Sequence, residues 1–326
     1  MHDSFVQRLI GRPEFGPLVL LIVEIVVFAL LSSTFLSTGN IANLLAFTPE
    51  LGIIAIGMTM LMTSGEFDLS VGSVFGFSAI IMWTLYNTGA ASLEIGFLVA
   101  MALALFIGFA NGWFVTVLKI PSFLVTLGML LVVRGSALYI TDGFPQGRWQ
   151  ADSPLMEILA GDFMVGSMRV YSSLIWFIAL AIILGYLLTQ TKVGNWIQAA
   201  GGNANAAQAR GVKVNRTKVL LFMLTSALAG LAGIISSIRV STANPNSGTG
   251  YELEVIAMVV IGGTALTGGR GTIIGTVLGV LILRLMRNGI VMVGVPGLAY
   301  NIFIGAIILG MMALHSWLER RHHAGT

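Results

Sequence analysis

Residues 172–190 read SSLIWFIALAIILGYLLTQ and contain no Asp, Glu, Lys or Arg. An α-helix needs about 20 mainly apolar residues to cross a bilayer, so this stretch is long enough to be a transmembrane helix. Its character is typical of the whole chain, in which 56% of the 326 residues are apolar and only 10% are charged. Soluble globular proteins carry about 25% charged residues. The composition therefore excludes an ordinary soluble enzyme and a disordered protein.

Other apolar blocks of helical length follow one another along the chain, separated by Gly, Pro and charged clusters. They lack the short alternation of apolar and polar residues that is typical of an outer-membrane barrel. We therefore predict an all-α, polytopic membrane protein with about ten transmembrane helices. The predicted spans are 17–36, 41–63, 70–87, 93–118, 122–141, 172–190, 216–239, 252–267, 272–290 and 296–316.

The first predicted span follows Arg8 and Arg12, as the apolar region of a signal peptide would. It is longer than such a region, contains Glu24 and has no small-residue cleavage site, so we expect a retained helix. A carboxylate in mid-span is costly, and Glu24 has either a structural or a functional role. Arg134, in the fifth span, either pairs with an acid or lies near an outer cavity.

Lysine and arginine are unevenly distributed over the predicted loops. An even number of spans places both termini on one side, and 11 of the 17 basic residues lie on that side. By the positive-inside rule this side is cytoplasmic. The opposite, external side has the longest predicted loop, residues 142–171, which is rich in acids. The net charge of +3 is spread over loops, so it indicates topology rather than nucleic-acid binding.

Several kinds of chemistry are absent from the sequence. The chain has no cysteine, and its four histidines lie near its ends, so thiolate chemistry is excluded and we expect no metal site. No G-x-x-x-x-G-K-[ST] motif occurs, so the chain has no P-loop for ATP. We therefore predict a protein that is not an enzyme, with no catalytic residues and no cofactor. Any work driven by ATP must come from a partner.

Three short patterns occur twice in the same order, which indicates an internal duplication. Their spacings are 43 and 10 residues in the first copy and 36 and 8 residues in the second. The copies would start an odd number of spans apart and so have opposite orientations, as in the inverted repeats of many transport proteins. The predicted halves are about 41–141 and 216–316. The matched pairs are Phe67–Val71 with Tyr251–Val255, Asn111-Gly112 with Asn288-Gly289, and Ile120-Pro121 with Val295-Pro296.

Acidic residues stand at equivalent ends of the repeated helices. An acid in the first turn of a helix is favoured by the free N–H groups and the helix dipole, so capping is one interpretation and contact with a transported substrate is another. The inverted repeat predicts that Asp68 and Glu252 lie on opposite sides of the membrane. The candidate pathway or gating residues are Asp68, Ser70, Asn111, Glu252 and Glu254.

Glycines recur every four residues at two places, Gly72 and Gly76, and Gly271, Gly275 and Gly279. Such spacing gives a helix a face of small residues, on which another helix can approach closely. The run 269–275 is not preceded by a strand and is not a dinucleotide-binding loop. We therefore predict a packing role for these glycines.

The segment 191–216 is the most informative stretch outside the predicted spans. Asn203 can cap a short helix, the run Ala204–Arg210 has high helix propensity, and Gly211 can end the helix. A helix of small residues flanked by Lys and Arg has no core of its own. We predict that it fits into a groove on another protein.

The run 202–212, GNANAAQARGV, resembles the coupling loop of ribose-type sugar permeases of bacterial ATP-binding cassette importers, within the branched-chain amino-acid/sugar permease superfamily. Two further runs resemble the same family: DLSVGS at 68–73 and GGTALTGGRGT at 262–272. The resemblance covers nearly the whole chain. It implies that the chain is a permease subunit that translocates a monosaccharide and performs no covalent chemistry itself.

The resemblance also implies partners and a location. The partners would be a cytoplasmic ATP-binding subunit, a periplasmic sugar-binding protein and a second permease copy or paralogue, in the lipid of the bacterial inner membrane and without nucleic acid. The chain would be one transmembrane permease domain, 1–326, with a cytoplasmic coupling segment at about 191–215. The residues implied to couple to the ATPase are Gly202, Asn203, Ala206, Ala207, Arg210 and Gly211.

These implications can be tested, and alternatives remain open. Ala207→Glu is expected to abolish transport, and Gln146 or Asp152 in the external loop should crosslink to the binding protein. One alternative is a permease of the branched-chain amino-acid type, which shares the architecture. Another is a secondary transporter driven by ions, which would need acids near the middle of the membrane.

Overall fold

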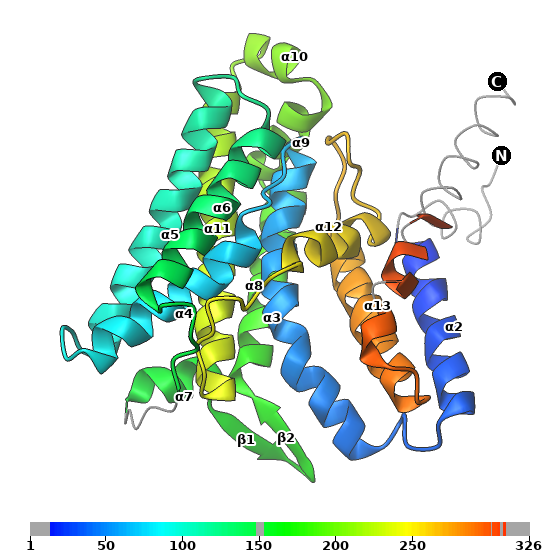
Figure 1. Ribbon diagram of the computed structural model, residues 1–326. Helices are drawn as coiled ribbons and strands as arrows, with labels where there is room; N and C mark the ends of the chain where they lie inside the picture. Colours follow the sequence, from blue (N-terminus) through cyan, green and yellow to red (C-terminus); the bar gives the residue numbers. More distant parts are fainter. Residues whose placement is uncertain (1–13, 148–152, 301, 307–308, 311–326) are drawn as a thin grey trace, which may run out of the picture.

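The computed structural model describes residues 14–147, 153–300, 302–306 and 309–310 (Figure 1). In these residues the fold is mostly helical, with one short β-hairpin. The helices are α2 (Phe15–Leu31), α3 (Thr38–Thr63), α4 (Val71–Asn87), α5 (Leu93–Thr116), α6 (Ser122–Ile140), α7 (Pro154–Ala160), α8 (Ser172–Gln190), α9 (Lys192–Gly202), α10 (Ala204–Ala209), α11 (Val214–Val240), α12 (Tyr251–Ile261), α13 (Ile273–Met292) and the 3-10 turn η1 (Gly297–Ala299). The strands are β1 (Asp162–Val165) and β2 (Met168–Tyr171).

Six of the described helices are long and apolar enough to cross a membrane: α3, α5, α6, α8, α11 and α13. Two more, α2 and α4, are apolar but shorter. Large apolar side chains on the outer helices are exposed, among them Leu98, Leu131 and Ile182. Soluble proteins rarely expose apolar surface so extensively, whereas lipid would cover it. The chain is therefore a multi-pass helical membrane protein.

Helix α3 lies at the centre of the molecule and packs against α8, α11, α12 and α13. It bends visibly along its length (Figure 1) and contains Pro49. Proline has no N–H to donate and its ring clashes with the preceding turn, which kinks a helix. Next to the proline, Glu50 forms a buried ion pair with Arg239 of α11. The guanidinium of Arg239 also lies 4.0 Å from the centre of the Phe47 ring, so the bend is held against α11.

The eighth predicted span, 252–267, is wrong in length because α12 ends at Ile261. Gly262 occupies its C-cap and Gly263 has a φ of +91°, a left-handed conformation that favours glycine. Residues 262–272 then form a loop rather than the end of a span (Figure 1). Most of the tenth predicted span, 296–316, lies outside the described residues.

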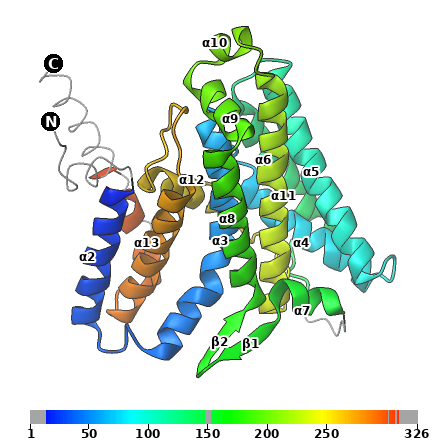
Figure 2. The same cartoon turned by 180° about the vertical axis from the view of Figure 1, so that it is seen from behind.

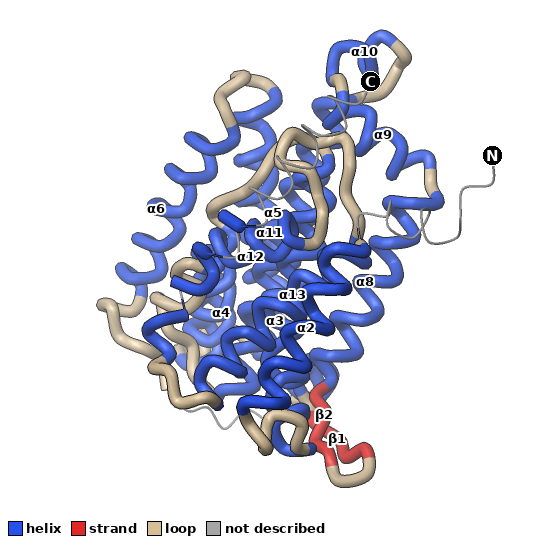
Figure 3. Tube along the Cα trace, turned by 90° about the vertical axis from the view of Figure 1, so that its right-hand side faces the viewer, coloured by secondary structure: helices blue, strands red, loops and turns tan. Residues whose placement is uncertain are grey.

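The predicted external loop, 142–171, contains regular structure that the sequence did not suggest. It includes α7 and the antiparallel hairpin β1–β2, in which Arg169 pairs with Asp162 at 3.1 Å. Gln146 forms a backbone bridge with Ala243, so this part of the chain is tied to the connection between α11 and α12. The hairpin and α10 lie at opposite ends of the molecule (Figure 3). Asp152 lies outside the described residues.

Candidate functional site

Asp68 is the centre of a buried polar cluster between α3 and α4. Its side chain is fully buried, and its Oδ1 atom accepts hydrogen bonds from the backbone N–H of Ser70 at 2.7 Å and from the Ser70 hydroxyl at 2.6 Å. Its Oδ2 atom accepts from Nδ2 of Asn111 in α5 at 3.2 Å and from Oγ of Ser226 in α11 at 3.4 Å. One carboxylate therefore joins three segments that are far apart in sequence.

Three of the five predicted pathway residues, Asp68, Ser70 and Asn111, thus lie together. The Asn111 amide also donates to the Ser70 hydroxyl at 3.0 Å. Ser226 completes the cluster and was not predicted, because a small hydroxyl residue in a long apolar helix gives no signal in one sequence. None of the ion pairs in the described part of the chain involves Asp68. The carboxylate of Asp68 is therefore stabilised by hydrogen-bond donors and not by a cation in this part of the chain.

Glu252 lies beside this cluster, at the point where the N-termini of α4 and α12 meet. A Cβ atom at Gly72, in the first turn of α4, would overlap Oε2 of Glu252 and the carbonyl oxygen of Gly248. The rings of Phe75 and Tyr251 stand edge to face at 5.2 Å. The prediction that Asp68 and Glu252 lie on opposite sides of the membrane is therefore wrong, because both short helices begin at one place inside the protein.

Arg134 of α6 holds the connection that leads into α12. Its Nη1 atom donates to the carbonyl oxygens of Pro245 at 2.6 Å and Ser247 at 2.8 Å. Gly76 of α4 faces the same connection, since a Cβ there would stand 2.8 Å from the Ser247 oxygen. Hence the glycine face of α4 approaches the connection before α12 and the first turn of α12, not the side of another long helix as predicted.

In the second run of glycines, Gly275 and Gly279 pack helices together as predicted, whereas Gly271 lies in the loop before α13 and faces the Thr63 side chain. A Cβ at Gly279 would overlap the carbonyl oxygen of Met258, and one at Gly275 would overlap that of Gly262. Both glycines let α13 approach α12 closely, because a side chain at either place has no room.

Glu254 does not belong to the Asp68 cluster. It points toward α13, where its Oε1 atom lies 3.7 Å from Nη1 of Arg287. Arg284 and Glu24, on α13 and α2, are also buried, and neither the Glu24 oxygens nor Nε and Nη2 of Arg284 has a partner among the described residues. Glu24 shares its buried helix face with Phe28, which contacts Gly289. It therefore faces α13 rather than lipid.

The predicted coupling segment folds as two short helices, α9 and α10. The Asn203 side chain accepts a hydrogen bond from the backbone N–H of Ala206 at 3.0 Å, so it caps α10 as predicted. Gly211, with a φ of +86°, follows the helix end. Five of the six predicted coupling residues are exposed, but Ala207 is buried against Ala200 and Val214. Because Ala207 anchors α10 to the protein, Ala207→Glu would disturb the helix itself.

Glycine backbones join the end of α9 to the two loops that carry the other motifs. A Cβ at Gly201 would overlap the carbonyl oxygen of Thr63 at the end of α3. The same oxygen accepts a hydrogen bond from the backbone N–H of Gly269 at 2.9 Å, and Gly269 has a φ of +81°. The α9 end, the loop after α3 and the loop 262–272 therefore meet in direct backbone contact.

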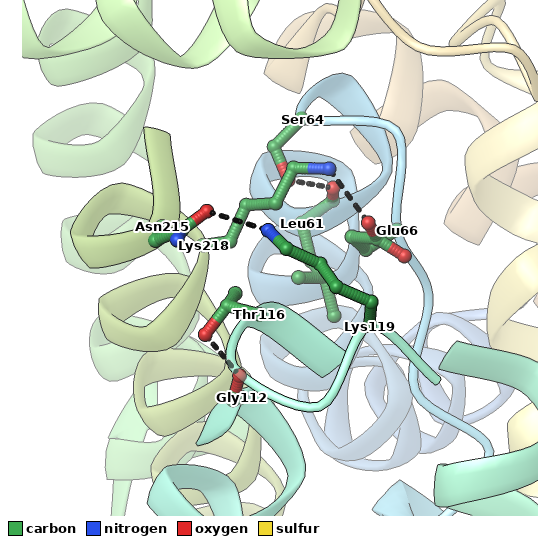
Figure 4. A network of polar contacts seen from close by, with 8 residues as sticks. All are labelled: Leu61, Ser64, Glu66, Gly112, Thr116, Lys119, Asn215 and Lys218. Carbon is green, nitrogen blue, oxygen red and sulfur yellow. Dashed lines mark hydrogen bonds and ion pairs between the residues drawn. The ribbon is translucent and has the colours of Figure 1, made fainter. Parts of the chain in front are cut away.

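A polar cavity of about 480 Å³ lies next to α10. It is bordered by Glu66, Lys119, Asn215 and Lys218, whose contacts are drawn in Figure 4. Lys218 pairs with Glu66 at 2.6 Å, and Nζ of Lys119 donates to Oδ1 of Asn215 at 3.4 Å. These contacts connect the start of α11 to the loop after α3 and to the turn between α5 and α6. Sequence reasoning missed them because the partners are far apart along the chain.

An apolar helical bundle with two short helices meeting at a buried polar cluster is the architecture of a membrane transporter. The sequence matches the family described as "branched-chain amino acid transport system / permease component" over residues 40–312. The chain therefore belongs to that family of permeases.

Several permeases whose names state the sugar that they transport are similar to the chain over most of its length. A ribose import permease protein of Escherichia coli K12 is 35% identical over 302 residues, 91% of each chain. A xylose/arabinose import permease protein of Sulfolobus acidocaldarius is 31% identical over 97% of this chain and 88% of its own. An L-arabinose ABC transporter permease protein of Azospirillum brasilense is 33% identical over 89% of this chain and 84% of its own. No solved structure matches the chain.

Proposed function

We propose that the protein is the permease subunit of an ATP-binding cassette importer that translocates a monosaccharide. The observation that carries this proposal is the similarity to ribose, xylose and arabinose permeases over about nine-tenths of the chain. All three of those sugars are pentoses, which makes a pentose the first substrate to test. The chain itself supplies a path through the membrane and no covalent step.

The proposed assembly contains a cytoplasmic ATP-binding subunit, a periplasmic sugar-binding protein and a second permease copy or paralogue. The permease is one domain, 1–326, in the bacterial inner membrane, with ten spans and both termini in the cytoplasm. In this orientation α10 faces the ATPase, and the hairpin β1–β2 faces the binding protein. The two features lie at opposite ends of the molecule, as such an arrangement requires.

We further propose that the halves 41–141 and 216–316 are an inverted repeat. Both contain a long helix, α3 with 26 residues and α11 with 27, followed by a connection and a shorter helix, α4 with 17 residues and α12 with 11. Long helices, α5 and α13, follow in both. Short helices that meet end to end inside the protein are the usual place of a substrate path in inverted-repeat transporters. Asp68, Ser70, Asn111 and Glu252 are our candidates for gating that path.

We propose that coupling to ATP hydrolysis uses the contacts that α9 makes with the loop after α3 and the loop 262–272. The ATPase would dock on the exposed residues Gly202, Asn203, Ala206, Arg210 and Gly211. A shift of α9 and α10 is passed by the Gly201 backbone to Thr63 and Gly269, and then along the loop that carries Asp68. ATP can drive this change only by binding one state of the ATPase dimer more tightly than the other.

Two alternatives have specific support. The family description names branched-chain amino acids, and the buried Asp68, which has no ion pair in the described part of the chain, is a feature that an ion-coupled carrier would need. The test is reconstitution with the ATPase and binding protein encoded beside the permease gene. We expect ribose, xylose or arabinose with the binding protein to stimulate ATP hydrolysis and uptake. Stimulation by leucine only, or uptake driven by an ion gradient without ATP, would favour an alternative.

A further inference from the structure

We propose that an apolar cavity between α8, α9 and α11 binds one anionic phospholipid. The cavity has a volume of about 490 Å³ and is lined by Leu187 of α8, Trp196 of α9, and Leu220 and Leu224 of α11, with Met60 of α3 behind them. It is separate from the Asp68 cluster and from the polar cavity beside α10. The inference uses the orientation proposed above, in which α9 lies at the cytoplasmic surface.

The cavity is a slot that opens toward the outside of the protein. Helix α3 packs against both α8 and α11, and α9 packs against α3, α8 and α11. Helix α3 therefore closes the slot on its inner side, and α9 closes one end. Figure 2 shows α8 and α11 descending beside each other below α9. At the opening, Val193, Trp196 and Leu220 are more than 40% exposed. Apolar side chains that line an open slot are suited to an acyl chain.

Positive charge is placed at one end of the slot. Lys213 and Arg216 line the cavity and are both exposed. Neither forms an ion pair in the described part of the chain, and no acidic residue lines the cavity. Basic pockets between membrane helices at the cytoplasmic side are suited to anionic lipid headgroups. Trp196 lies on the same rim, and tryptophan is enriched where headgroups and hydrocarbon meet.

The length of the slot favours a lipid over a soluble anion. From Lys213 to Leu224 the chain advances about 16 Å along α11, at 1.5 Å per residue. One leaflet of the hydrocarbon core is about 15 Å thick. A phosphate beside Lys213 and Arg216 would therefore place an acyl chain along Leu220 and Leu224 for the depth of its own leaflet. A soluble phosphate would leave the apolar part empty.

The test is native mass spectrometry of the purified full-length protein, titrated with phosphatidylglycerol or phosphatidylcholine of equal chain length. We expect one tightly retained phosphatidylglycerol and no comparable phosphatidylcholine. Because each basic residue near a lipid surface strengthens binding of an anionic lipid about fivefold, Lys213→Ala/Arg216→Ala should weaken retention by about thirtyfold. Arg270→Ala removes an exposed positive charge from the loop 262–272, which does not line the cavity, and is the matched control. It should retain the lipid as the unmodified protein does.

Two further experiments distinguish a lipid from other possible occupants of the cavity. Leu224→Trp should fill the slot and displace the lipid with Lys213 and Arg216 intact, and excess glycerol 3-phosphate should not displace it. Three results would overturn the proposal: equal retention of both lipids, unchanged retention by the double variant, or displacement by glycerol 3-phosphate. A dimer in which the second copy covers the slot and excludes lipid would overturn it as well. The assay measures no transport, so its failure is distinguishable from failure of the proposed function.

Discussion

At the scale of single residues, Asp68 has more influence than its position in a loop suggests. A buried carboxylate without a counter-charge persists only when donors surround it. Here those donors come from Ser70, Asn111 of α5 and Ser226 of α11. The same bonds that make the charge tolerable therefore also fix the loop against two helices.

Asp68→Asn is predicted to destabilise the protein by about 1–3 kcal/mol, the cost of leaving a buried polar group unsatisfied. The new amide can still accept from Ser70, but its NH₂ group must then face the NH₂ group of Asn111. The measurement is thermal unfolding in detergent together with sugar uptake in vesicles. The double variant Asp68→Asn/Asn111→Asp places a carboxylate opposite an amide again and should recover much of the loss. If the double variant were as unstable as both single changes combined, the bond would not be the cause.

Gly72 gives a second prediction at this scale. Gly72→Ala should lower the unfolding temperature and reduce uptake, because its Cβ would overlap the Glu252 carboxylate and the Gly248 carbonyl oxygen. Gly128→Ala on α6 is the matched control, since nothing lies within 4 Å of a Cβ there, and it should be neutral. Glu252→Ala in the Gly72→Ala protein should restore little, because the backbone overlap with Gly248 remains. Equal stability of the two alanine variants would show that the short helices do not meet as described.

Sequence reasoning grouped Asp68, Ser70 and Asn111 correctly, although it could not see their contacts. It grouped Glu254 with them because the repeat matches Tyr251–Val255 with Phe67–Val71, which sets Glu254 opposite Ser70. In the structure Glu252 and Glu254 diverge, one toward Gly72 and the other toward Arg287. Residues two apart on a helix do not share a face. Only the packing of α12 between α4 and α13 decides which neighbour each acid meets.

At the scale of elements, capping signals were the most informative feature of the sequence. The start and end of α10 were predicted from Asn203 and Gly211, because both act through their own backbone neighbourhood. The end of α12 was not predicted, since residues 262–267 remain apolar enough to extend a span. Hydropathy cannot distinguish a helix that continues from a glycine loop buried in protein, because the backbone of both can be satisfied internally.

The structure changes the substitution that best tests docking of α10. Ala206→Glu adds a charge on the exposed side of α10, so it should leave expression and unfolding temperature unchanged while abolishing stimulation of the ATPase. Ala207→Glu buries the same charge against Ala200 and Val214 and should lower the unfolding temperature as well. Both are measured by ATP hydrolysis in the reconstituted complex and by unfolding of the permease alone. Normal ATPase stimulation in Ala206→Glu would exclude this face of α10 as the docking surface.

At the scale of the whole molecule, composition and periodicity were sufficient for the class of protein but not for its interior. Low charge and long apolar blocks predict a helical membrane protein whatever the order in which the helices pack. The central place of α3, the buried Glu50–Arg239 pair and the junction of α9 with Gly269 all depend on contacts between residues far apart in sequence. A single sequence holds no record of such contacts.

The orientation of the whole molecule gives the last prediction. The chain has no cysteine, so one introduced thiol reports one position. Met164 in β1 is 61% exposed at the hairpin end, and Ala206 is exposed on α10 at the other end. In intact spheroplasts a membrane-impermeant maleimide should label Met164→Cys and spare Ala206→Cys, and in inverted vesicles the pattern should reverse. Gln146 is a less suitable position for the thiol, because its backbone pairs with Ala243 and its side chain forms a 2.6 Å hydrogen bond with Thr84. Labelling of both thiols from one side would contradict the proposed topology, because a protein that couples an external donor to an internal ATPase must present the two ends to different compartments.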